Sequence, residues 1–489
     1  MPMQPADVRA ALEAMRSADL PTHGGQTLAY VYDSGLAEAD AVGREALAMF
    51  ASANGLDPTA FPSLLTMEND LVAMAGRLLA APPSAVGTLT SGGTESILLA
   101  VQTARDGRPD VAAPEMVLPT TAHAAFHKAA HYFGVRPLFV DVDERTMRAD
   151  PEAMSAAITG HTVLVVASAP SYAHGVVDPV ADIAAAAAAH GVRCHVDACI
   201  GGWVLPYLVR HGADLPGFDL AVEGVTSISV DLHKYAYTPK GVSVLLHREA
   251  GLRRPQFFAS AAWPGYTMLN STTQSTKSGG PIAAAWAVTR CIGDEGYDAL
   301  ARQVRDGMAH LVTGVDEIAH VSVVVPPDST LVALQADDAC DVFTISDELL
   351  DRGWYTQPQL SFKGFGPTLH LTLSAATADR VPDFLRALAE AVETASAAGP
   401  VEVPDELSAA AATIDPAGLD DAAFDGLLEL AGLGGDGGEG GVALPSRMAP
   451  VNALLDVAPP ALREALLVTF LDRLARPSPA HPTDSSDRG

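Results

Sequence analysis

One lysine stands at a position suited to carbonyl chemistry. In TSISVDLHKYAYTPKG, residues 226 to 241, Lys234 directly follows His233 at the end of an alternating run. The run has the period-two pattern of a half-buried strand, with apolar Ile228, Val230 and Leu232 on one face and polar Ser227, Ser229, Asp231 and His233 on the other. A lysine held against apolar surroundings loses hydration of its ammonium form, so we expect a lowered pKa and a neutral amine able to form a Schiff base. A strand-end lysine with its head in solvent is the commoner arrangement, so other segments must decide between the two.

A glycine turn near residue 92 is a candidate anion site. In TLTSGGTESILLA, residues 88 to 100, a strand turns through Gly92 and Gly93, and a helix opens at Thr94 with Glu95 in its first turn. Backbone N–H groups and the hydroxyls of Ser91 and Thr94 would then converge at a helix N-terminus, which stabilises anions. The segment matches neither the dinucleotide fingerprint nor the phosphate loop with its Lys-Ser/Thr, and a glycine turn with a threonine cap is the alternative interpretation.

Asp197 and His123 each follow a predicted strand. In VRCHVDACIGGW, residues 192 to 203, the alternation places Asp197 away from the hydrophobic side at the carboxyl end of a strand. A buried carboxylate needs a cation or a donor to stay ionised, and a protonated pyridine nitrogen would be such a partner. The alternative is an aspartate that caps the turn before Gly201 and Gly202. His123 in PTTAHAAFHKAA lies where a strand passes into a helix, so its imidazole could stack on a planar ring or simply start the helix.

Alternating strands and helices carry these residues. From residue 86 to about 250, short apolar runs such as VGTLT, TVLVVASA and GVSVLLH alternate with helical stretches. This order predicts a mainly parallel sheet covered on both faces, whose ligands bind at the carboxyl ends of the strands. Beyond residue 301 the sequence predicts a smaller α+β domain, from VSVVVPPDSTLVALQA, a helix around DVFTISDELLDRG, TLHLTLS, a helix over DRVPDFLRALAEAVETA and a last amphipathic helix in PPALREALLVTFLDRLAR.

The composition is that of an acidic globular protein. The 489 residues are 48% hydrophobic, and no apolar run approaches the ~20 residues needed to cross a bilayer, so we expect a soluble protein without a membrane anchor. Thirty Lys and Arg against 59 Asp and Glu give a net charge of -29, which disfavours nucleic acid as a partner. The N-terminus shows no secretory or transit signal, so a cytoplasmic location is expected. Four cysteines without CxxC spacing predict reduced, packed thiols, and we expect no metal site.

These segments, considered jointly, resemble a known family. Gly92-Gly93-Thr94, His123, Asp197 and His233-Lys234 occur in the order and spacing of the group II pyridoxal-phosphate decarboxylases. Within that family the chain is most similar to the sphingosine-1-phosphate lyases, through TSGGTESI, TAHAAFHKAAHYFG, SYAHGVVDPV, HVDACIGGW, VTSISVDLHKYAYTPKG, WPGYTMLNSTTQSTKSGG, GWYTQPQL and LHLTLS. The resemblance covers roughly residues 30 to 475. It implies PLP fold type I, the aspartate aminotransferase-like α/β fold, with a large domain built on a mainly parallel sheet and a smaller α+β C-terminal domain.

The resemblance also implies a role for each site residue. Lys234 would carry pyridoxal 5'-phosphate as an aldimine, Asp197 would pair with the pyridine nitrogen, and His123 would stack on the ring; these three would be catalytic. The cofactor would be held further by Gly92, Gly93, Thr94, Ser168 and His233, and by Thr276 from the other subunit of a homodimer. Tyr32, Asp57 and Lys240 match positions near the substrate.

Two reactions are compatible with these roles. Asp197 would keep the pyridine protonated, so electrons released at the substrate Cα would flow into the ring as a quinonoid. A lyase would break the Cα–Cβ bond of a phosphorylated β-hydroxy amine, giving an aldehyde and an amine phosphate, whereas an amino-acid decarboxylase would release the carboxylate. The whole-length resemblance favours the lyase. A catalytically inactive PLP-binding regulatory protein is a further alternative, against which the complete lysine, aspartate and histidine set argues. A nucleotide-binding regulator is disfavoured because the phosphate-loop lysine is missing.

Two departures from the lyase pattern bear on the substrate. Where the lyases have Asn-Pro-Leu-His-Pro, this chain has Asn54-Gly-Leu-Asp57-Pro58, so a carboxylate that repels anions replaces a histidine near the phosphate region. Lys277 replaces an arginine of the glycine-flanked loop, which exchanges a two-pronged donor for a point charge.

The expected organisation has four parts. Residues 1–85 would form a helical segment that contributes to the dimer and the active site, and residues 86–300 the large PLP-binding domain. Residues 301–476 would form the small domain, with a flexible glycine-rich loop at 432–441, and residues 477–489 a disordered tail. The expected partners are a small-molecule substrate and a second copy of the chain, with the active site shared between the two subunits.

Overall fold

The chain divides into two compact units. The structure is a computed structural model that describes residues 2–266, 268–430 and 446–476. The first unit comprises Met1–Val315, Val323–Ala333 and His370–Asp383, and the second comprises Asp316–Ser322, Leu334–Leu369 and Phe384–Gly489. Helix α10, Gly279–Val315, runs across residue 300, where the sequence predicts a domain boundary, so the first unit continues beyond that position. The glycine-rich loop expected at 432–441 and the tail expected at 477–489 lie outside the described residues.

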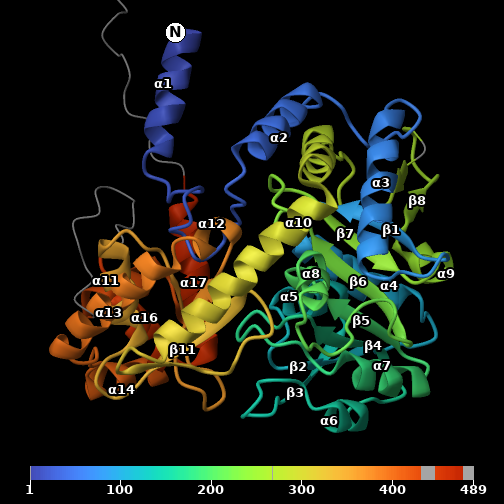
Figure 1. Ribbon diagram of the computed structural model, residues 1–489. Helices are drawn as coiled ribbons and strands as arrows, with labels where there is room; N and C mark the ends of the chain where they lie inside the picture. Colours follow the sequence, from blue (N-terminus) through green and yellow to red (C-terminus); the bar gives the residue numbers. More distant parts are fainter. Residues whose placement is uncertain (1, 267, 431–445, 477–489) are drawn as a thin grey trace, which may run out of the picture. The chain divides into compact units, whose positions relative to one another are not determined.

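A seven-stranded sheet is the centre of the first unit (Figure 1). Its strands are β1 Val86–Thr90, β2 Glu115–Pro119, β3 Arg136–Val140, β4 Thr162–Ser168, β5 Arg193–Asp197, β6 Val225–Asp231 and β7 Ser243–His247. The strand order is β1-β7-β6-β5-β4-β2-β3. Strands β3, β2, β4, β5 and β6 pair in parallel, whereas β7 is antiparallel to both β1 and β6. The prediction of a mainly parallel sheet is therefore confirmed.

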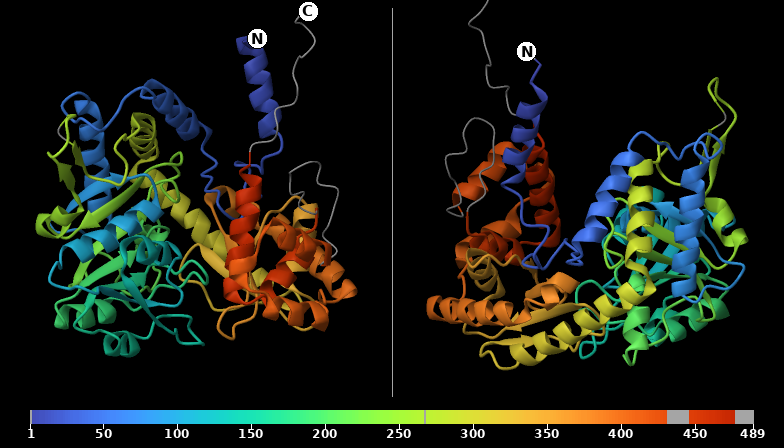
Figure 2. Two further views of the ribbon diagram at one scale, coloured as in Figure 1. Left: turned by 180° about the vertical axis from the view of Figure 1, so that it is seen from behind. Right: turned by 45° about the horizontal axis from the view of Figure 1, so that its top comes forward.

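Only some of the helices of the first unit cover this sheet (Figure 1). The helices of this unit are α1 Pro5–Arg16, α2 Ala37–Met49, α3 Pro62–Leu78, α4 Gly93–Asp106, α5 Ala125–Phe133, α6 Pro151–Ala156, α7 Val180–Ala189, α8 Leu205–Arg210, α9 Ala250–Arg253, α10 and α12 Ala375–Ala378, with short 3-10 turns η1 Gly201–Trp203 and η2 Arg254–Gln256. Helix α4 packs across β1 and β4 to β7, and α7 packs on β4 and β5. Helices α2 and α3 both pack against α10, and Figure 2 shows the three side by side.

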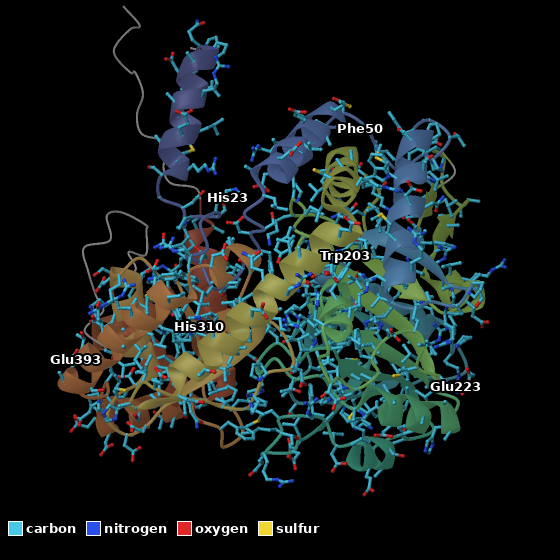
Figure 3. All side chains as sticks on the ribbon, viewed as in Figure 1. His23, Phe50, Trp203, Glu223, His310 and Glu393 are labelled. Atoms are coloured by element: carbon cyan, nitrogen blue, oxygen red, sulfur yellow. The ribbon has the colours of Figure 1, made fainter. Side chains whose placement is uncertain are left out.

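The central strands are buried on both faces. Every residue of β4 is buried, as expected for a parallel strand with helices on either side. Trp203 of η1 (Figure 3) is also buried. Its ring meets that of Tyr297 edge-on, with the ring centres 5.4 Å apart. Strand β6 differs from the half-buried strand that its alternation predicts, because its polar face is covered as well. Ser229 is 0% exposed and Asp231 is 2% exposed, so the polar row of β6 faces the interior and not solvent.

Two smaller sheets complete the described strands. Strands β10 Val321–Val323, β11 Leu331–Ala336, β12 Gln357–Gln359 and β13 Thr368–Thr372 form a sheet of order β10-β11-β13-β12. Strands β8 Phe258–Ser260 and β9 Met268–Asn270 form an antiparallel pair.

The second unit is mainly helical. Its helices are α11 Val342–Asp351, most of α13 Val381–Ala398, α14 Asp405–Thr413, α15 Asp421–Leu430, α16 Ala449–Val457 and α17 Pro460–Leu474, with the short turn η3 Pro416–Gly418. Asp347 of α11 accepts hydrogen bonds from the backbone N–H groups of Met448 and Ala449 at the start of α16. An acidic side chain at that end stabilises the helix and fixes α16 on α11. Within the ranges that the structure describes, no helix combines the length and the apolar character needed to cross a bilayer.

Candidate active site

A cavity of about 420 Å³ opens at the carboxyl ends of the parallel strands of the first unit. Parallel strands end at one edge of a sheet, so residues distant in sequence converge there. Of the twelve residues that the resemblance places in the cofactor or substrate site, eight line this cavity: Gly92, Gly93, Thr94, His123, Ser168, Asp197, His233 and Lys234. Ser168 and Asp197 are directly paired as the last residues of β4 and β5.

Lys234 forms an ion pair with Asp231, the last residue of β6. Its Nζ lies 2.9 Å from Asp231 Oδ2, and both side chains are largely buried. Burial alone would lower the pKa of Lys234, but the negative charge of Asp231 and its hydrogen bond raise it above the ordinary value. The lowered pKa predicted from the apolar face of the strand is therefore wrong. The error arose because the side chain of Asp231, on the opposite face of β6, reaches Lys234 after the turn.

Asp231 is itself fixed by several contacts. Ser243 Oγ of the neighbouring β7 donates to Asp231 Oδ1 at 2.5 Å, and His233 Nε2 lies 3.7 Å from Asp231 Oδ2. Burial would raise the pKa of Asp231, yet the charges of Lys234 and His233 hold it below the usual value. Asp231 thus stays ionised although it is only 2% exposed.

Asp197 lies at the same edge of the sheet with a different partner. Its Oδ1 accepts the backbone N–H of Cys199 at 3.1 Å, and the carboxyl group faces the cavity. Behind it, His195 contacts Ser227 Oγ at 2.8 Å and Ser229 Oγ at 3.2 Å. Burial lowers the pKa of His195 to about 4, so that ring is neutral and adds no positive charge to the site. The carboxyl group of Asp197 is therefore available to a ligand in the cavity.

The glycine turn closes one side of the cavity. Helix α4 begins at Gly93 with Gly92 as its N-cap, and Glu95 lies in its first turn as predicted. Glu95 accepts the N–H of Ser91 at 2.6 Å and that of Thr273 at 3.0 Å, so it joins the turn to the loop after β9. A Cβ on Gly93 would lie 2.7 Å from Asp231 Oδ2 and 2.8 Å from Cys199 Sγ. Only a residue without a side chain fits at Gly93 without displacing these neighbours.

The two histidines of the site are held by backbone groups. His123 lies just before α5, where its Nδ1 accepts the N–H of Ala125 at 3.1 Å, and its ring meets Tyr172 edge-on at 6.2 Å. His233 Nδ1 lies 3.2 Å from the carbonyl oxygen of Val242. A carbonyl can only accept, so this nitrogen carries the hydrogen. Burial lowers the pKa of His233 below the ordinary value, against the opposing effect of Asp231.

The other four of the twelve residues do not line the cavity: Tyr32, Asp57, Lys240 and Thr276. Tyr32 and Lys240 are close to it, because Lys240 Nζ donates to the carbonyl oxygens of Tyr30 at 2.9 Å and His233 at 3.4 Å. Lys240 also lies 5.0 Å from the centre of the Tyr32 ring. Lys240 is an exposed residue, but loss of hydration around its amine and the charge of Lys234 lower its pKa to about 8.

Asp57 and Lys277 are each engaged locally. Asp57 is exposed, and its carboxylate accepts the backbone N–H of Thr59 at 2.8 Å and the hydroxyl of Thr59 at 2.6 Å, so it stabilises its own turn. These hydrogen bonds lower its pKa. Lys277 forms an ion pair with Glu68 at 2.7 Å, and Thr276 beside it is exposed. Asp57 and Lys277, the two residues that depart from the lyase pattern, therefore each bind a neighbouring side chain in this chain.

The sequence interpretation passed over three residues of the site: Asp231, Asp178 and Tyr172. Asp178, which is fully buried, accepts the N–H of Ser168 at 2.8 Å and that of Ala149 at 2.9 Å, and so fixes the end of β4. Tyr172 lines the cavity and stacks on His370 with ring centres 4.3 Å apart. Asp231 carried a detectable signal, since it lies three residues before Lys234 on the polar face. Asp178 and Tyr172 lie in a loop whose path the local pattern does not predict.

A histidine and two aspartates gather outside the cavity. His23, which lies between α1 and α2 (Figure 3), has its ligand atom within 4.8 Å of those of Asp33 and Asp40. Asp33 already accepts the N–H groups of Gly24 at 2.8 Å and Gly35 at 2.9 Å. We therefore infer that these three residues stabilise the loop between α1 and α2.

Known proteins are similar to this chain in sequence and in fold. Residues 22–336 match the pyridoxal-dependent decarboxylase conserved domain, and residues 405–473 match the C-terminal HTH domain of pyridoxal-dependent enzymes. A sphingosine-1-phosphate lyase of Arabidopsis thaliana is 38% identical over 366 residues, which are 73% of this chain and 66% of that protein. The matched region thus spans just under two thirds of that relative.

Solved structures agree with this relationship. A sphingosine-1-phosphate lyase of Burkholderia pseudomallei has a TM-score of 0.77 and 33% identity, over 81% of this chain and 92% of that one. A glutamate decarboxylase of Lactobacillus brevis has a TM-score of 0.72 at 18% identity, over 83% of this chain and 95% of that one, which shows the shared fold alone. The fold is PLP fold type I, and the cofactor of these enzymes is pyridoxal phosphate. The chain belongs to the pyridoxal-dependent decarboxylase family.

Proposed function

We propose that this protein is a pyridoxal-phosphate-dependent carbon–carbon lyase that cleaves a phosphorylated β-hydroxy amine to an aldehyde and an amine phosphate. The observation that carries the proposal is the convergence of Lys234, Asp197, His123 and the glycine turn on one cavity of about 420 Å³. The substrate class is supported by the two relatives named as sphingosine-1-phosphate lyases.

The residues present fit the cofactor. An amine, a carboxylate and an anion site must lie around one planar ring, and the cavity has all three on its wall. The crowding at Gly93 supports this, since any side chain there would collide with Asp231 and Cys199 and alter the turn that would bind the phosphate. When bound, pyridoxal phosphate supplies an electron sink for the charge left at the substrate Cα.

Each residue of the cavity then has a physical task. Lys234 would hold the cofactor covalently, and the carboxylate of Asp197 would keep the proton on the ring nitrogen. His123 would orient the ring by stacking on it. Gly93, Thr94 and His233 would bind the phosphate, at a helix N-terminus whose N–H groups favour an anion. Gly92 and Ser168 would complete the wall of the cofactor site.

Lys240 and Tyr32 would act on the substrate. With a pKa of about 8, Lys240 is mainly an ammonium at neutral pH and is suited to attract the substrate phosphate. Tyr32 lies under Lys240 and meets Tyr235 edge-on at 5.1 Å, so its ring is held in one orientation. The place of Asp57 near the substrate remains part of this proposal, although its carboxylate bonds to Thr59 in this chain.

A homodimer would complete the site. Thr276, expected among the phosphate ligands, is exposed and does not line the cavity of its own chain. Phe258 on the preceding β8 is 55% exposed and Leu269 on β9 is 61% exposed. Apolar side chains of this size favour burial at an interface. We therefore propose that the loop after β9, which contains Thr276, enters the active site of a second copy of the chain.

Amino-acid decarboxylation is the second candidate, because the matching family model is that of the decarboxylases. One assay separates the two. The purified protein with pyridoxal phosphate is incubated with a long-chain β-hydroxy amine phosphate or with pooled amino acids, and the aldehyde and the carbon dioxide are measured. We expect aldehyde from the phosphorylated amine and no activity in Lys234→Ala. Carbon dioxide without aldehyde would replace the lyase by the decarboxylase, and no product from either would contradict both.

A further inference from the structure

We propose that Asp231 is a positioning residue for Lys234: its carboxylate holds the ε-amine as an ammonium at the edge of the cavity and thereby sets the pH at which the lysine captures pyridoxal phosphate. The proposal rests on the proposed function, because it needs Lys234 to be the attachment point.

The first support is the geometry of the pair. Lys234 Nζ lies 2.9 Å from Asp231 Oδ2, and Lys234 is 19% and Asp231 2% exposed. An ion pair this close and this shielded from water is stronger than one at the surface. Removing one partner of a buried pair leaves an uncompensated charge, so the ammonium form of Lys234 and the ionised form of Asp231 stabilise each other.

The second support is the rigidity of Asp231. It ends β6, its backbone N–H donates to the carbonyl of Cys199 at 3.0 Å, and Oδ1 accepts from Ser243 Oγ at 2.5 Å. Its carboxyl oxygens also pack against the position that a Cβ on Gly93 would occupy. The carboxylate therefore cannot turn away when Lys234 moves, and it defines where the amine rests.

The third support is the charge around the lysine. Asp231 approaches from β6, Tyr32 from the segment before α2, and Cys199 from the loop after β5; if ionised, each would raise the pKa of Lys234. Lys240 and His233 also face the pair, and the charge of Lys234 lowers the pKa of both. The nearest ionised group is the carboxylate of Asp231, so its removal should have the largest effect on Lys234.

The chemical consequence concerns capture of the cofactor. An ammonium has no free electron pair, so Lys234 must first release one proton to water. The neutral amine then adds to the aldehyde carbon, the C=N double bond forms, and the aldehyde oxygen leaves as water. Asp231 disfavours the first of these steps, so capture should accelerate with rising pH. An opposite charge at this distance shifts a pKa by about one to three units.

The test compares cofactor capture by full-length protein freed of cofactor, as wild type, Asp231→Asn and Asp328→Asn, between pH 6 and 10. Asp328 is the matched control because it also forms an ion pair with a basic residue, Arg148, at 2.7 Å, and it does not line the cavity. Absorbance follows capture by pyridoxal phosphate without substrate. We expect Asp231→Asn to capture at least about tenfold faster at pH 7, with the midpoint of its pH profile lower by at least about one unit. Asp328→Asn should follow the wild type.

An unchanged midpoint in Asp231→Asn would overturn the inference. Capture that is faster by the same factor at every pH would also overturn it, because that result would show relief of repulsion between Asp231 and the cofactor phosphate. If Asp231→Asn does not fold, competitive acetylation of the five lysines of the wild-type chain provides the second measurement. Lys234 should titrate above Lys128 and Lys363, and titration at or below them would contradict the proposal.

A third readout separates this inference from the proposed function. Borohydride reduction and peptide mapping show which lysine carries the pyridoxyl group. An adduct on Lys234 with an unchanged pH profile in Asp231→Asn defeats the inference alone. Absence of any adduct on Lys234 defeats the proposed function and the inference with it.

Discussion

Asp197 and Asp231 end neighbouring parallel strands, yet their surroundings give them different chemistry. Asp197 accepts one backbone N–H and faces the cavity, whereas Asp231 is committed to Lys234 and Ser243. Two carboxyl groups at one sheet edge thus divide into a ligand-facing group and a lysine-facing group. The environment of each residue, and not its type, decides its task.

Asp197→Ala tests the ligand-facing carboxylate. If Asp197 pairs with the ring nitrogen as proposed, its removal takes away the charge that would keep that nitrogen protonated, so we expect turnover to fall by at least about 100-fold. Cofactor should still bind, because Lys234 and the glycine turn are unchanged, and its absorbance checks this in the same sample. Wild-type turnover in this variant would contradict the proposed pairing.

Lys240 gives the site a pH dependence with a definite sign. Loss of hydration around its amine and the charge of Lys234 lower the pKa of Lys240 to about 8, so the ammonium form is present below that pH and is lost above it. If the charge attracts the substrate phosphate, kcat/KM should fall as pH rises through about 8. Lys240→Arg keeps its charge at all these pH values, so the fall should disappear in that variant. The measurement is kcat/KM from pH 6 to 10, and an identical fall in both proteins would exclude Lys240 as its origin.

The residue types of the site could be predicted from the sequence, but their electrostatics could not. The alternation of β6 places Lys234 at a strand end beside the cavity, as expected. Its pKa depends on Asp231, whose approach to Lys234 is set by the turn that follows the strand. Likewise Asp178 reaches Ser168 from a loop ten residues away, a contact that periodicity does not encode.

At the scale of elements, the start of α4 offers a matched pair of glycines. A Cβ on Gly93 would lie 2.7 Å from Asp231, whereas a Cβ on Gly92 would meet nothing closer than 3.8 Å, at His233. We expect Gly93→Ala to weaken the binding of pyridoxal phosphate at least about tenfold, because the turn must shift away from the bound phosphate. Gly92→Ala should weaken it much less. Titration of both variants measures this, and equal losses would show that crowding is not the cause.

The end of β4 depends on Asp178. Burial raises the pKa of this carboxyl group to about 6, above the ~3.9 of an unfolded chain. The folded protein then binds more protons between these values, so this group contributes stability below about pH 4 that is lost as pH rises through 6. Asp178→Asn removes this dependence. The free energy of unfolding of both proteins is measured with denaturant from pH 4 to 7. The difference between wild type and Asp178→Asn should change by at most about 3 kcal/mol over this range. A difference that stays constant would contradict the raised pKa of Asp178.

The strands were predictable because strands of a sheet covered by helices are largely buried and leave short apolar runs in the sequence. VGTLT is β1 and TVLVVASA contains β4, with bounds that agree closely. The direction of β7 was not predictable, since GVSVLLH has the same apolar pattern as the parallel strands of the sheet. Its antiparallel pairing follows from the short connection after Lys234, which is too short for a crossover helix.

At the scale of the whole molecule, charge sets the choice of partners. Residues 405–473, which match an HTH domain, contain twelve Asp and Glu against three Lys and Arg. The whole chain has a net charge of -29. Such a field repels nucleic acid, so we expect this domain to act within the protein and not on a polyanion. A small anionic substrate can still bind where local donors converge, as they do at the start of α4.

The proposed sharing of the active site between two subunits can be tested with mixed dimers. Lys234→Ala lacks the attachment point, and Thr276→Asp would place a negative charge beside the cofactor phosphate of the other subunit. Mixed dimers of the two variants contain one site with an intact Lys234 and an intact Thr276. If subunits exchange freely at equal amounts, half of the dimers are mixed and one of their two sites works, so about a quarter of wild-type activity should return. Each variant alone is the control. A mixture as inactive as its components would show that Thr276 serves the active site of its own subunit.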